Sequence, residues 1–341
     1  MEYKNTLPKS IQLAHGSGGQ MTRELLDQII FNTFKNPYLE QKHDGAIVPV
    51  KGPVVISTDS FVVSPIFFRG GDIGELAVNG TVNDVAMCGG IPEFISLGFI
   101  IEEGLEMDAF LKGGESVKRA AGEAGVQVVT GDTKVVESGK GDKIFINTTG
   151  IGSPHPKAAI AMERVQAGDR ILVSGPIAAH GMAIMSEREG LEFESEIQSD
   201  TTCLNHIVGD LLTAFGADIH LLRDPTRGGL SGVCSEIAQD SDLGILLREN
   251  DLPLDRQVAA ACEILGLDPL YVANEGVFCA VVAPAAAEAV LEFMRKHPKG
   301  SRAAFVGTLH EDHPGKVVME SQVGGKRIVT PLIGEQLPRI C

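Results

Sequence analysis

Four aspartates in the first half of the chain have side chains suited to a magnesium site. Asp44 and Asp59 flank short β-type runs, whereas Asp84 lies in an otherwise apolar helical stretch. Asp132 follows another β-type run in Gly131-Asp132-Thr133-Lys134. Carboxylates that converge repel one another unless cations lie among them, and hard oxygen ligands suit Mg²⁺ shared with nucleotide phosphates. The alternative is that each aspartate caps a turn or is hydrogen-bonded in the core.

The stretch 330–341 places a cysteine, Cys341, on a tether. Pro331 and Pro338 remove backbone donors, and Gly334 leaves one flexible point between them, so the stretch is unlike a sheet strand. A tethered thiol presents a nucleophilic sulfur at high effective concentration. The alternative is a frayed end with an incidental thiol.

Two further charged side chains are candidates for proton and phosphate chemistry. Lys134 lies two residues after Asp132 and can neutralise a phosphate or a leaving oxygen, although a surface lysine in a weak ion pair fits equally. Glu275 lies in Asn274-Glu275-Gly276, before an apolar strand expected at 277–282. Taken without any other information, Glu275 is better described as an exposed turn carboxylate.

Two glycine-rich stretches each precede a helical pattern. His15-Gly16-Ser17-Gly18-Gly19 comes before an apolar stripe of helical spacing, and Asp224-Pro225-Thr226-Arg227-Gly228-Gly229 comes before a helix expected from 230. Backbone N–H groups at such helix starts can hold phosphate. Neither G-x-G-x-x-G nor the Walker pattern is present, so plain flexible loops remain the alternative.

Strand-type and helix-type patterns alternate and predict an α/β or α+β protein of two domains. Asp72 is placed to cap a helix over 73–87, with Asn83 beside Asp84 in its middle. We expect the first domain at 1–154, the second at 155–329 and a flexible tail at 330–341. The expected strands of the first domain are 46–50, 54–58, 61–63, 94–101, 126–130 and 143–152.

Charge and composition exclude several classes of partner. The formal net charge of −16 argues against nucleic acid and anionic membranes. The first residues lack the apolar core of a signal peptide, and no apolar run is long enough to span a membrane, so we expect a cytoplasmic protein. The six cysteines include no C-x-x-C, and the first five are expected to be buried apolar side chains.

Several motifs together resemble those of the HypE family of nickel–iron hydrogenase maturation proteins. This family belongs to the superfamily of aminoimidazole ribonucleotide synthetase and selenophosphate synthetase, and the resemblance runs along the whole chain. The ending PRIC at 338–341 is particular to the family, whereas the acidic and glycine motifs are shared across the superfamily. The matching stretches are 15–19 (HGSGG), 57–65 (STDSFVVSP), 79–90 (NGTVNDVAMCGG), 131–136 (GDTKVV), 224–230 (DPTRGGL) and 274–276 (NEG).

The resemblance implies a carbamoyl dehydratase with the two-domain fold of that superfamily, in which helices flank mixed sheets. A partner, HypF, would place a carbamoyl group on the sulfur of Cys341, and ATP would drive its dehydration to a thiocyanate. The HypC–HypD complex would accept the cyanide, and first-domain sheets would join across a two-fold homodimer.

Site residues follow from the same resemblance. Cys341 would carry the substrate, while Glu275 would take protons and Lys134 would stabilise negative charge. The expected Mg²⁺ ligands are Asp44, Asp84 and Asp132. The expected ATP-binding residues are His15, Gly16, Gly18, Gly19, Asp59, Asn83, Gly228 and Gly229.

Two other functions remain open from the sequence. One is a superfamily synthetase or kinase that acts on a small molecule and does not depend on Cys341. The other is a non-catalytic carrier that displays a modified cysteine, although a carrier has little use for convergent carboxylates.

Overall fold

The computed structural model describes residues 8–16, 20–41, 46, 48–50, 52–190, 197–331 and 340. Four predicted site residues therefore lie outside the described residues: Gly18, Gly19, Asp44 and Cys341.

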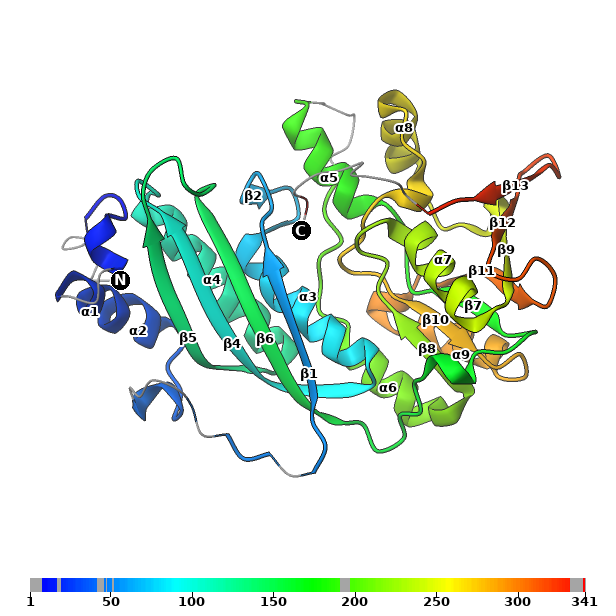
Figure 1. Ribbon diagram of the computed structural model, residues 1–341, viewed down its shortest axis with the longest axis horizontal. Coiled ribbons are helices and arrows are strands. Elements are labelled where there is room, and N and C mark those ends of the chain that lie inside the picture. The colour runs from blue at the N-terminus through cyan, green and yellow to red at the C-terminus, as the bar shows by residue number, and fades with distance from the viewer. Residues whose placement is uncertain are drawn as a thin grey trace.

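The first unit is a four-stranded mixed sheet with helices on one face (Figure 1). The strand order is β1-β6-β4-β5, where β4 and β5 are parallel and the other pairs antiparallel. Helices α3 and α4 pack on one face and bury the apolar side chains between them and the sheet. The elements are β1 (Val55–Phe61), α3 (Ile73–Met87), β4 (Gly90–Glu102), α4 (Met107–Ala124), β5 (Gln127–Val136) and β6 (Ile144–Pro154).

Helix α3 begins where the sequence predicts, because Asp72 caps it. Asp72 Oδ1 accepts the backbone N–H groups of Gly74 at 2.9 Å and Glu75 at 3.1 Å. The helix is buried on nearly all sides, since the first sheet covers one side and the second unit covers the other. An apolar helix of this kind belongs between two layers, and α3 therefore brings Asn83 and Asp84 to the junction of the two units.

The second unit is a seven-stranded sheet between two layers of helices. Its order is β13-β12-β9-β11-β7-β10-β8, and only β12 and β9 are parallel. Apolar residues of α7 pack on one face, and those of α6 and α9 pack on the other (Figure 1). The strands are β7 (Arg170–Val173), β8 (Ile219–Arg223), β9 (Gly244–Arg248), β10 (Cys279–Val282), β11 (Ala304–His310), β12 (Val317–Glu320) and β13 (Lys326–Val329). The helices are α5 (Ala179–Arg188), α6 (Asn205–Phe215), α7 (Gly229–Ser241), α8 (Arg256–Leu265) and α9 (Ala287–Lys296).

Short elements complete the described chain. Near the N-terminus, the turn η2 packs against β5, at the edge of the first sheet farthest from the second unit (Figure 1). The remaining elements are η2 (Leu13–Gly16), α1 (Gln20–Leu25), η3 (Leu26–Ile30), α2 (Phe31–Thr33), η4 (Leu39–Gln41), β2 (Phe67–Phe68), β3 (Gly71–Asp72), η5 (Met162–Arg164), η6 (Gly216–Asp218), η7 (Glu249–Asp251), η8 (Pro269–Tyr271) and η9 (Pro298–Gly300).

Three expectations about strands need correction. The described residues of 46–50 form no strand, because apolar composition alone does not supply a pairing partner. The separate strands expected at 54–58 and 61–63 are one strand, β1, so Asp59 lies inside it. Asp132 and Lys134 likewise lie inside β5 and not in a turn.

The mixed α/β architecture is as predicted, and the boundary positions stay a prediction. Strand β6 ends at Pro154 and β13 ends at Val329, next to the expected boundaries. Within the described part of the chain, no helix has both the length and the apolar character that a membrane crossing requires.

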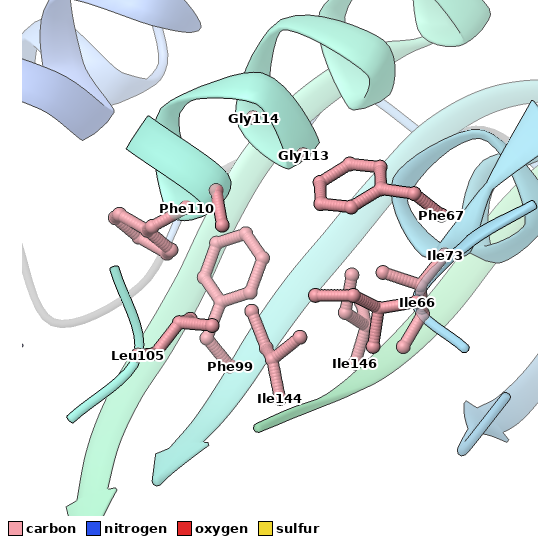
Figure 2. A pocket seen from close by; sticks show the side chains of 11 residues that line it. Ile66, Phe67, Ile73, Phe99, Leu105, Phe110, Gly113, Gly114, Ile144 and Ile146 are labelled. Carbon is pink, nitrogen blue, oxygen red and sulfur yellow. The ribbon is translucent and has the colours of Figure 1, made fainter. Parts of the chain in front are cut away.

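One hollow in the first unit is part of its core. It lies between α4 and the sheet, and Figure 2 shows Phe99, Phe110 and Ile144 pointing into it. Every residue that lines it is apolar, including Gly113 and Gly114 of α4. A hollow without polar groups does not suit a charged phosphate ligand.

Candidate active site

The junction of the two units gathers carboxylates from both. Asp84 on α3 and Asp59 on β1 come from the first unit and are half-buried. Ser57 Oγ donates a hydrogen bond to Asp84 Oδ2 at 2.7 Å. Burial raises the pKa of Asp84, the Ser57 bond opposes that rise, and the charge of Asp59 adds to it. The two side chains therefore form one patch of uncompensated negative charge.

The second unit contributes Asp224, which follows β8 directly. Burial, followed by the charge of Asp84, raises the pKa of the Asp224 carboxyl to about 7. Arg223 and Arg227 lower the pKa of Asp84, but both arginines are exposed, and Arg223 is paired with Glu236. The arginines thus offset only part of the negative charge, and a cation bound here would be stabilised.

Glu275 is a buried carboxyl and not the exposed turn residue that its local sequence favours. It is 4% exposed, and Oε1 has no hydrogen-bond partner among the described residues. Burial, followed by the charges of Asp224 and Asp200, raises its pKa well above the ordinary value. A Cβ placed on Gly80 would come within 3.9 Å of Glu275 Oε2, so this carboxyl lies against α3.

Asp200 is a second buried acid that the sequence did not single out. Its Oδ1 accepts the backbone N–H of Glu275 at 3.1 Å, and the carboxylate also accepts from the backbone of Gly276 and His180. Burial nevertheless raises the pKa of Asp200 to about 6. Oδ2 has no partner among the described residues. The only available signal was a polar stretch, Ser199 to Thr202, between two apolar helices.

Asn83 joins the two units through its side-chain amide. Nδ2 donates to the carbonyl oxygens of Thr202 at 3.0 Å and Glu275 at 3.3 Å, and Oδ1 accepts from the backbone N–H of Leu204 at 2.7 Å. Both amide protons are therefore used within the protein. The structure gives Asn83 the task of positioning the Glu275 turn, which the prediction of an ATP contact did not anticipate.

The glycines 228 and 229 begin α7 beside Asp224. Gly229 has φ +59°, and a Cβ there would lie 2.6 Å from the carbonyl oxygens of Leu270 and Val272. Only glycine allows the helix to begin so close to that segment. No side chain caps the first turn of α7, but the backbone N–H of Gly229 already donates to the carbonyl oxygen of Thr226 at 3.0 Å. An anion at this helix start would therefore meet the N–H groups that follow Gly229.

A second group of predicted residues lies at the other edge of the first sheet. Asp132 and Lys134 are on β5, where Lys134 Nζ lies 3.2 Å from Asp132 Oδ2 and both side chains are about two-thirds exposed (65% and 66%). They pair in register with Gly98 and Ile100, which places them on the helix-free face. His15 is buried in η2, and its Nδ1 accepts the backbone N–H of Gln12, so residues 13–16 form a turn packed on β5 and not a loose loop.

One chain does not bring the two groups together. β1 and β5 are opposite edges of a four-stranded sheet, three strand spacings or roughly 14 Å apart. His15, Gly16, Asp132 and Lys134 lie near β5, whereas Asp59, Asn83, Asp84, Gly228, Gly229 and Glu275 lie at the junction of the units. Among the described residues, no three His, Cys, Asp or Glu side chains are close enough to hold a metal ion.

Ile340, the residue before Cys341, lies at the junction as well. Ile340 is 5% exposed and packs in the same apolar cluster as Ile184 of α5 and Ala273. Its carbonyl oxygen accepts a hydrogen bond from His180 Nε2 at 2.5 Å. The backbone N–H of Gly181, next to His180, donates to the carbonyl oxygen of Ala273 at 3.1 Å, and Ala273 is two residues before Glu275. Ile340 is thus linked through residues 180 and 181 to the segment that carries Glu275.

Comparison with known proteins decides the family. Residues 42–153 match the N-terminal domain of AIR synthase related proteins, and residues 166–320 match their C-terminal domain. The chain is 50% identical over 333 residues to the carbamoyl dehydratase HypE of Azotobacter vinelandii, covering 97% of each. It is 42% identical to the carbamoyl dehydratase HypE of Escherichia coli K12, covering 97% of this chain and 99% of that one. The chain belongs to the HypE family.

Solved structures agree with this assignment and confirm the predicted fold. A crystal structure of the hydrogenase maturation protein HypE in complex with ATP is 46% identical, with a TM-score of 0.93 and coverage of 97% and 99% of the two chains. A HypE–HypF complex contains a chain 44% identical, with a TM-score of 0.80 and coverage of 90% and 99%. A thiamine-monophosphate kinase from Stenotrophomonas maltophilia shares the fold, with a TM-score of 0.66 at 19% identity over 87% of this chain and 95% of that one.

Proposed function

We propose that this HypE-family protein is an ATP-dependent carbamoyl dehydratase that acts on an S-carboxamide carried by its own Cys341. The observation that supports this most strongly is the position of Ile340, which is buried against His180. Asp200 accepts the backbone N–H groups of both His180 and Glu275, so Ile340 lies near the Glu275 turn. A substrate attached to the next residue starts within about 3.8 Å, Cα to Cα, of that position. The relatives called carbamoyl dehydratase support the reaction type.

The reaction balances without any further reactant. The carboxamide oxygen attacks the γ-phosphorus of ATP, the bond to ADP breaks, and the oxygen becomes a phosphate ester. Nitrogen then loses its two protons while the carbon–oxygen bond breaks, which leaves S–C≡N and inorganic phosphate. Phosphorylation thus turns oxide, a poor leaving group, into a good one. The site must exclude water, because the activated ester would otherwise be hydrolysed.

Glu275 is the proton acceptor in this proposal. A carboxyl whose pKa is raised well above its ordinary value is a stronger base than an exposed one, but it must first be deprotonated. A cation near the junction lowers that pKa and makes the carboxylate available. Asp200 supports the placement, since it accepts the backbone N–H of Glu275.

The carboxylates at the junction fit Mg²⁺ when phosphate is also bound. Mg²⁺ commonly takes one or two carboxylates, with phosphate oxygens and water completing its shell. Burial is the largest cause of the raised pKa values of Asp224 and Glu275, and the charge of Asp84 adds to the first as that of Asp224 adds to the second. This supports a site where a cation would be stabilised. Asp84 would be a ligand of the metal, Asp59 and Asp224 would add negative charge around it, and Asp44 and Asp132 remain proposed ligands. When bound, Mg²⁺ neutralises charge on the transferring phosphoryl group. The N-terminus of α7, which begins with Gly228 and Gly229, would receive phosphate oxygens at the N–H groups of its first turn that follow Gly229.

A homodimer accounts for the division of the predicted site residues. The helix-free face of the first sheet exposes Ile56 (62%) and Ile100 (44%), and a second copy covers this face. If the two-fold axis runs along the strands, β5 of the second copy lies over β1. The second copy's Lys134 and Asp132, with its His15 and Gly16, then approach the Asp84–Glu275 side. ATP would bind between the two groups, with Gly18 and Gly19 following on the same loop.

Partners and location follow from the family. HypF would donate the carbamoyl group, as the solved HypE–HypF complex of a similar chain supports. The HypC–HypD complex would take up the cyanide, and we place this work in the cytoplasm.

The decisive experiment measures intact and peptide mass of S-carbamoylated protein before and after addition of ATP and Mg²⁺. We expect the loss of one water, confined to the peptide that carries Cys341. Asp84→Asn should be carbamoylated by HypF and then fail to lose water, which separates an enzyme from a carrier. Unchanged mass in the parent protein, or turnover of ATP on a free metabolite by Cys341→Ser, would overturn the proposal.

A further inference from the structure

His180, near the start of α5, is fully buried between the two units. Its side chain has no exposed surface, and the ring of Phe68 from the first unit packs against it edge-on with centroids 5.6 Å apart. Burial lowers the pKa of His180 to about 4, so the imidazole is neutral at physiological pH. A neutral imidazole has one donor nitrogen and one acceptor nitrogen.

The partners of His180 determine which nitrogen carries the proton. Nε2 lies 2.5 Å from the carbonyl oxygen of Ile340, which can only accept, so Nε2 is the donor. Nδ1 must then accept, and it lies 2.8 Å from Ser199 Oγ, which can donate. Ser199 Oγ in turn accepts the backbone N–H of Thr201 at 3.1 Å, which orients its proton toward the ring. The chain of bonds fixes the tautomer that holds Ile340.

The same short segment also holds the Glu275 turn. Ser199 bonds the His180 ring, while its neighbour Asp200 accepts the backbone N–H groups of His180 and Glu275. The backbone N–H of Ser199 donates to the carbonyl oxygen of Arg69 at 2.8 Å, which anchors the segment on the first unit. The position of Ile340 is therefore tied to the position of Glu275 through residues 199 and 200.

We propose that His180 is a positioning residue that seats Ile340 and thereby presents the group on Cys341 to Glu275. This inference rests on the proposed function. His180 does not touch the reacting atoms. Its imidazole holds the backbone one residue away from the substrate, and Ser199 keeps the imidazole in the donating tautomer.

A plain structural role for His180 predicts different behaviour. If His180 only fills space, its replacement should lower the stability of the protein. It should not raise the alkylation rate of Cys341 more than that of other cysteines. The chain offers a matched control in His220, which is 6% exposed and bonds Asp169 Oδ2 through Nδ1 at 2.8 Å. Its environment is buried and polar, but its bond does not involve the tail.

The first measurement is alkylation of the reduced full-length protein, followed by peptide mass. Cys88 is exposed, so the expectation that the first five cysteines are buried is wrong at this one position, and Cys88 serves as the internal reference for Cys341. In His180→Leu we expect Cys341 to react about tenfold faster relative to Cys88, the ratio that one ordinary hydrogen bond supports. His180→Gln, which keeps a donor near the position of Nε2, should restore most of the protection. His220→Leu should lower the melting temperature and leave the Cys341 to Cys88 ratio unchanged.

The second measurement uses the S-carbamoylated variants with ATP and Mg²⁺. His180→Leu should accept the carbamoyl group from HypF and lose water about tenfold more slowly, with the KM for ATP unchanged. Ser199→Ala provides a milder test if His180→Leu does not fold, and should increase Cys341 alkylation about threefold, as loss of a weaker contact would. The inference would be overturned if the alkylation rate of Cys341 relative to Cys88 were the same in the parent protein, in Ser199→Ala and in every His180 variant that folds. Failure of the parent to lose water would sink the proposed function, and the alkylation ratios would still decide whether His180 seats the tail.

Discussion

Asn83 of α3 accepts the backbone N–H of Leu204 at 2.7 Å, and this bond crosses from the first unit to the second. The same amide donates to the carbonyl oxygens of Thr202 and Glu275. One side chain therefore fixes the start of α6 and the turn that carries the proposed base. Replacing it removes the Asn83 partner of three backbone groups, of which those of Leu204 and Glu275 are buried and that of Thr202 is partly buried.

Asn83→Ala should lower the free energy of unfolding by on the order of 2–6 kcal/mol, since each of the two buried groups left unpaired costs about 1–3 kcal/mol. Urea unfolding measures this. Asn32→Ala is the control, because Asn32 is exposed and bonds only the carbonyl oxygen of Gln28 among the described residues; its effect should stay within about 0.5 kcal/mol. Equal effects of the two substitutions would show that the amide does not join the units.

Lys134 and Glu275 should complement each other between chains. Lys134→Ala and Glu275→Gln should each abolish dehydration as homodimers. In a dimer of one Lys134→Ala chain and one Glu275→Gln chain, one site regains both groups if Lys134 acts in the second copy's site. An equal mixture with free exchange should therefore recover about a quarter of parent activity. No recovery, despite heterodimers shown by native mass spectrometry, would place both residues in one chain's site.

The helix-free face of the first sheet should carry the dimer contact. Ile56→Lys puts a charge on this face, where the side chain is 62% exposed in one chain. We expect a shift from dimer to monomer in light scattering, because an unpaired charge in an apolar contact is unfavourable. Ile264→Lys is the matched control, since Ile264 is 66% exposed on α8 of the other unit. A dimer that survives Ile56→Lys but not Ile264→Lys would move the contact to the second unit.

Gly229→Ala should lower the free energy of unfolding far more than a glycine substitution that introduces only backbone strain. The new Cβ would lie 2.6 Å from two carbonyl oxygens, in addition to the positive φ of +59°. We expect a loss of about 3 kcal/mol or more in the free energy of unfolding. Gly266→Ala, with φ +67° and nothing within 4 Å, isolates the backbone effect and should cost about 1 kcal/mol. Similar losses at both glycines would contradict the close approach of α7.

His180 should account for a measurable part of the stability that the protein loses at acid pH. Burial lowers its pKa to about 4 in the folded protein from the ordinary value of 6.5, so the folded state resists protonation. The stability that the protein gains from a neutral His180 is fully present above pH 6.5 and is lost as the pH falls toward 4. Between pH 7 and pH 5 the parent should lose on the order of 1–2 kcal/mol that His180→Gln does not lose, measured by urea unfolding. Parallel pH profiles would show that the imidazole is not buried as a neutral group.

The sequence was sufficient to predict those features that depend on residues close together along the chain. Asp72 caps α3 by accepting the N–H groups that follow it, and α7 begins at Gly229, next to the helix expected from 230. The family resemblance, carried by the motifs and by PRIC at 338–341, is confirmed by the comparisons. The strand expected at 46–50 was wrong because a strand needs a partner from elsewhere in the chain, which composition cannot supply.

Tertiary structure alone decided which functional side chains meet. Sequence patterns grouped Asp84, Asp132 and Lys134, but a sheet of four strands separates Asp132 and Lys134 from Asp84 by its width. Burial of Glu275, and the parts played by Asp200 and His180, depend on how the second unit packs against α3. The physical reason is that a carboxyl's pKa and a histidine's tautomer are set by neighbours in space, which residues distant in the sequence provide.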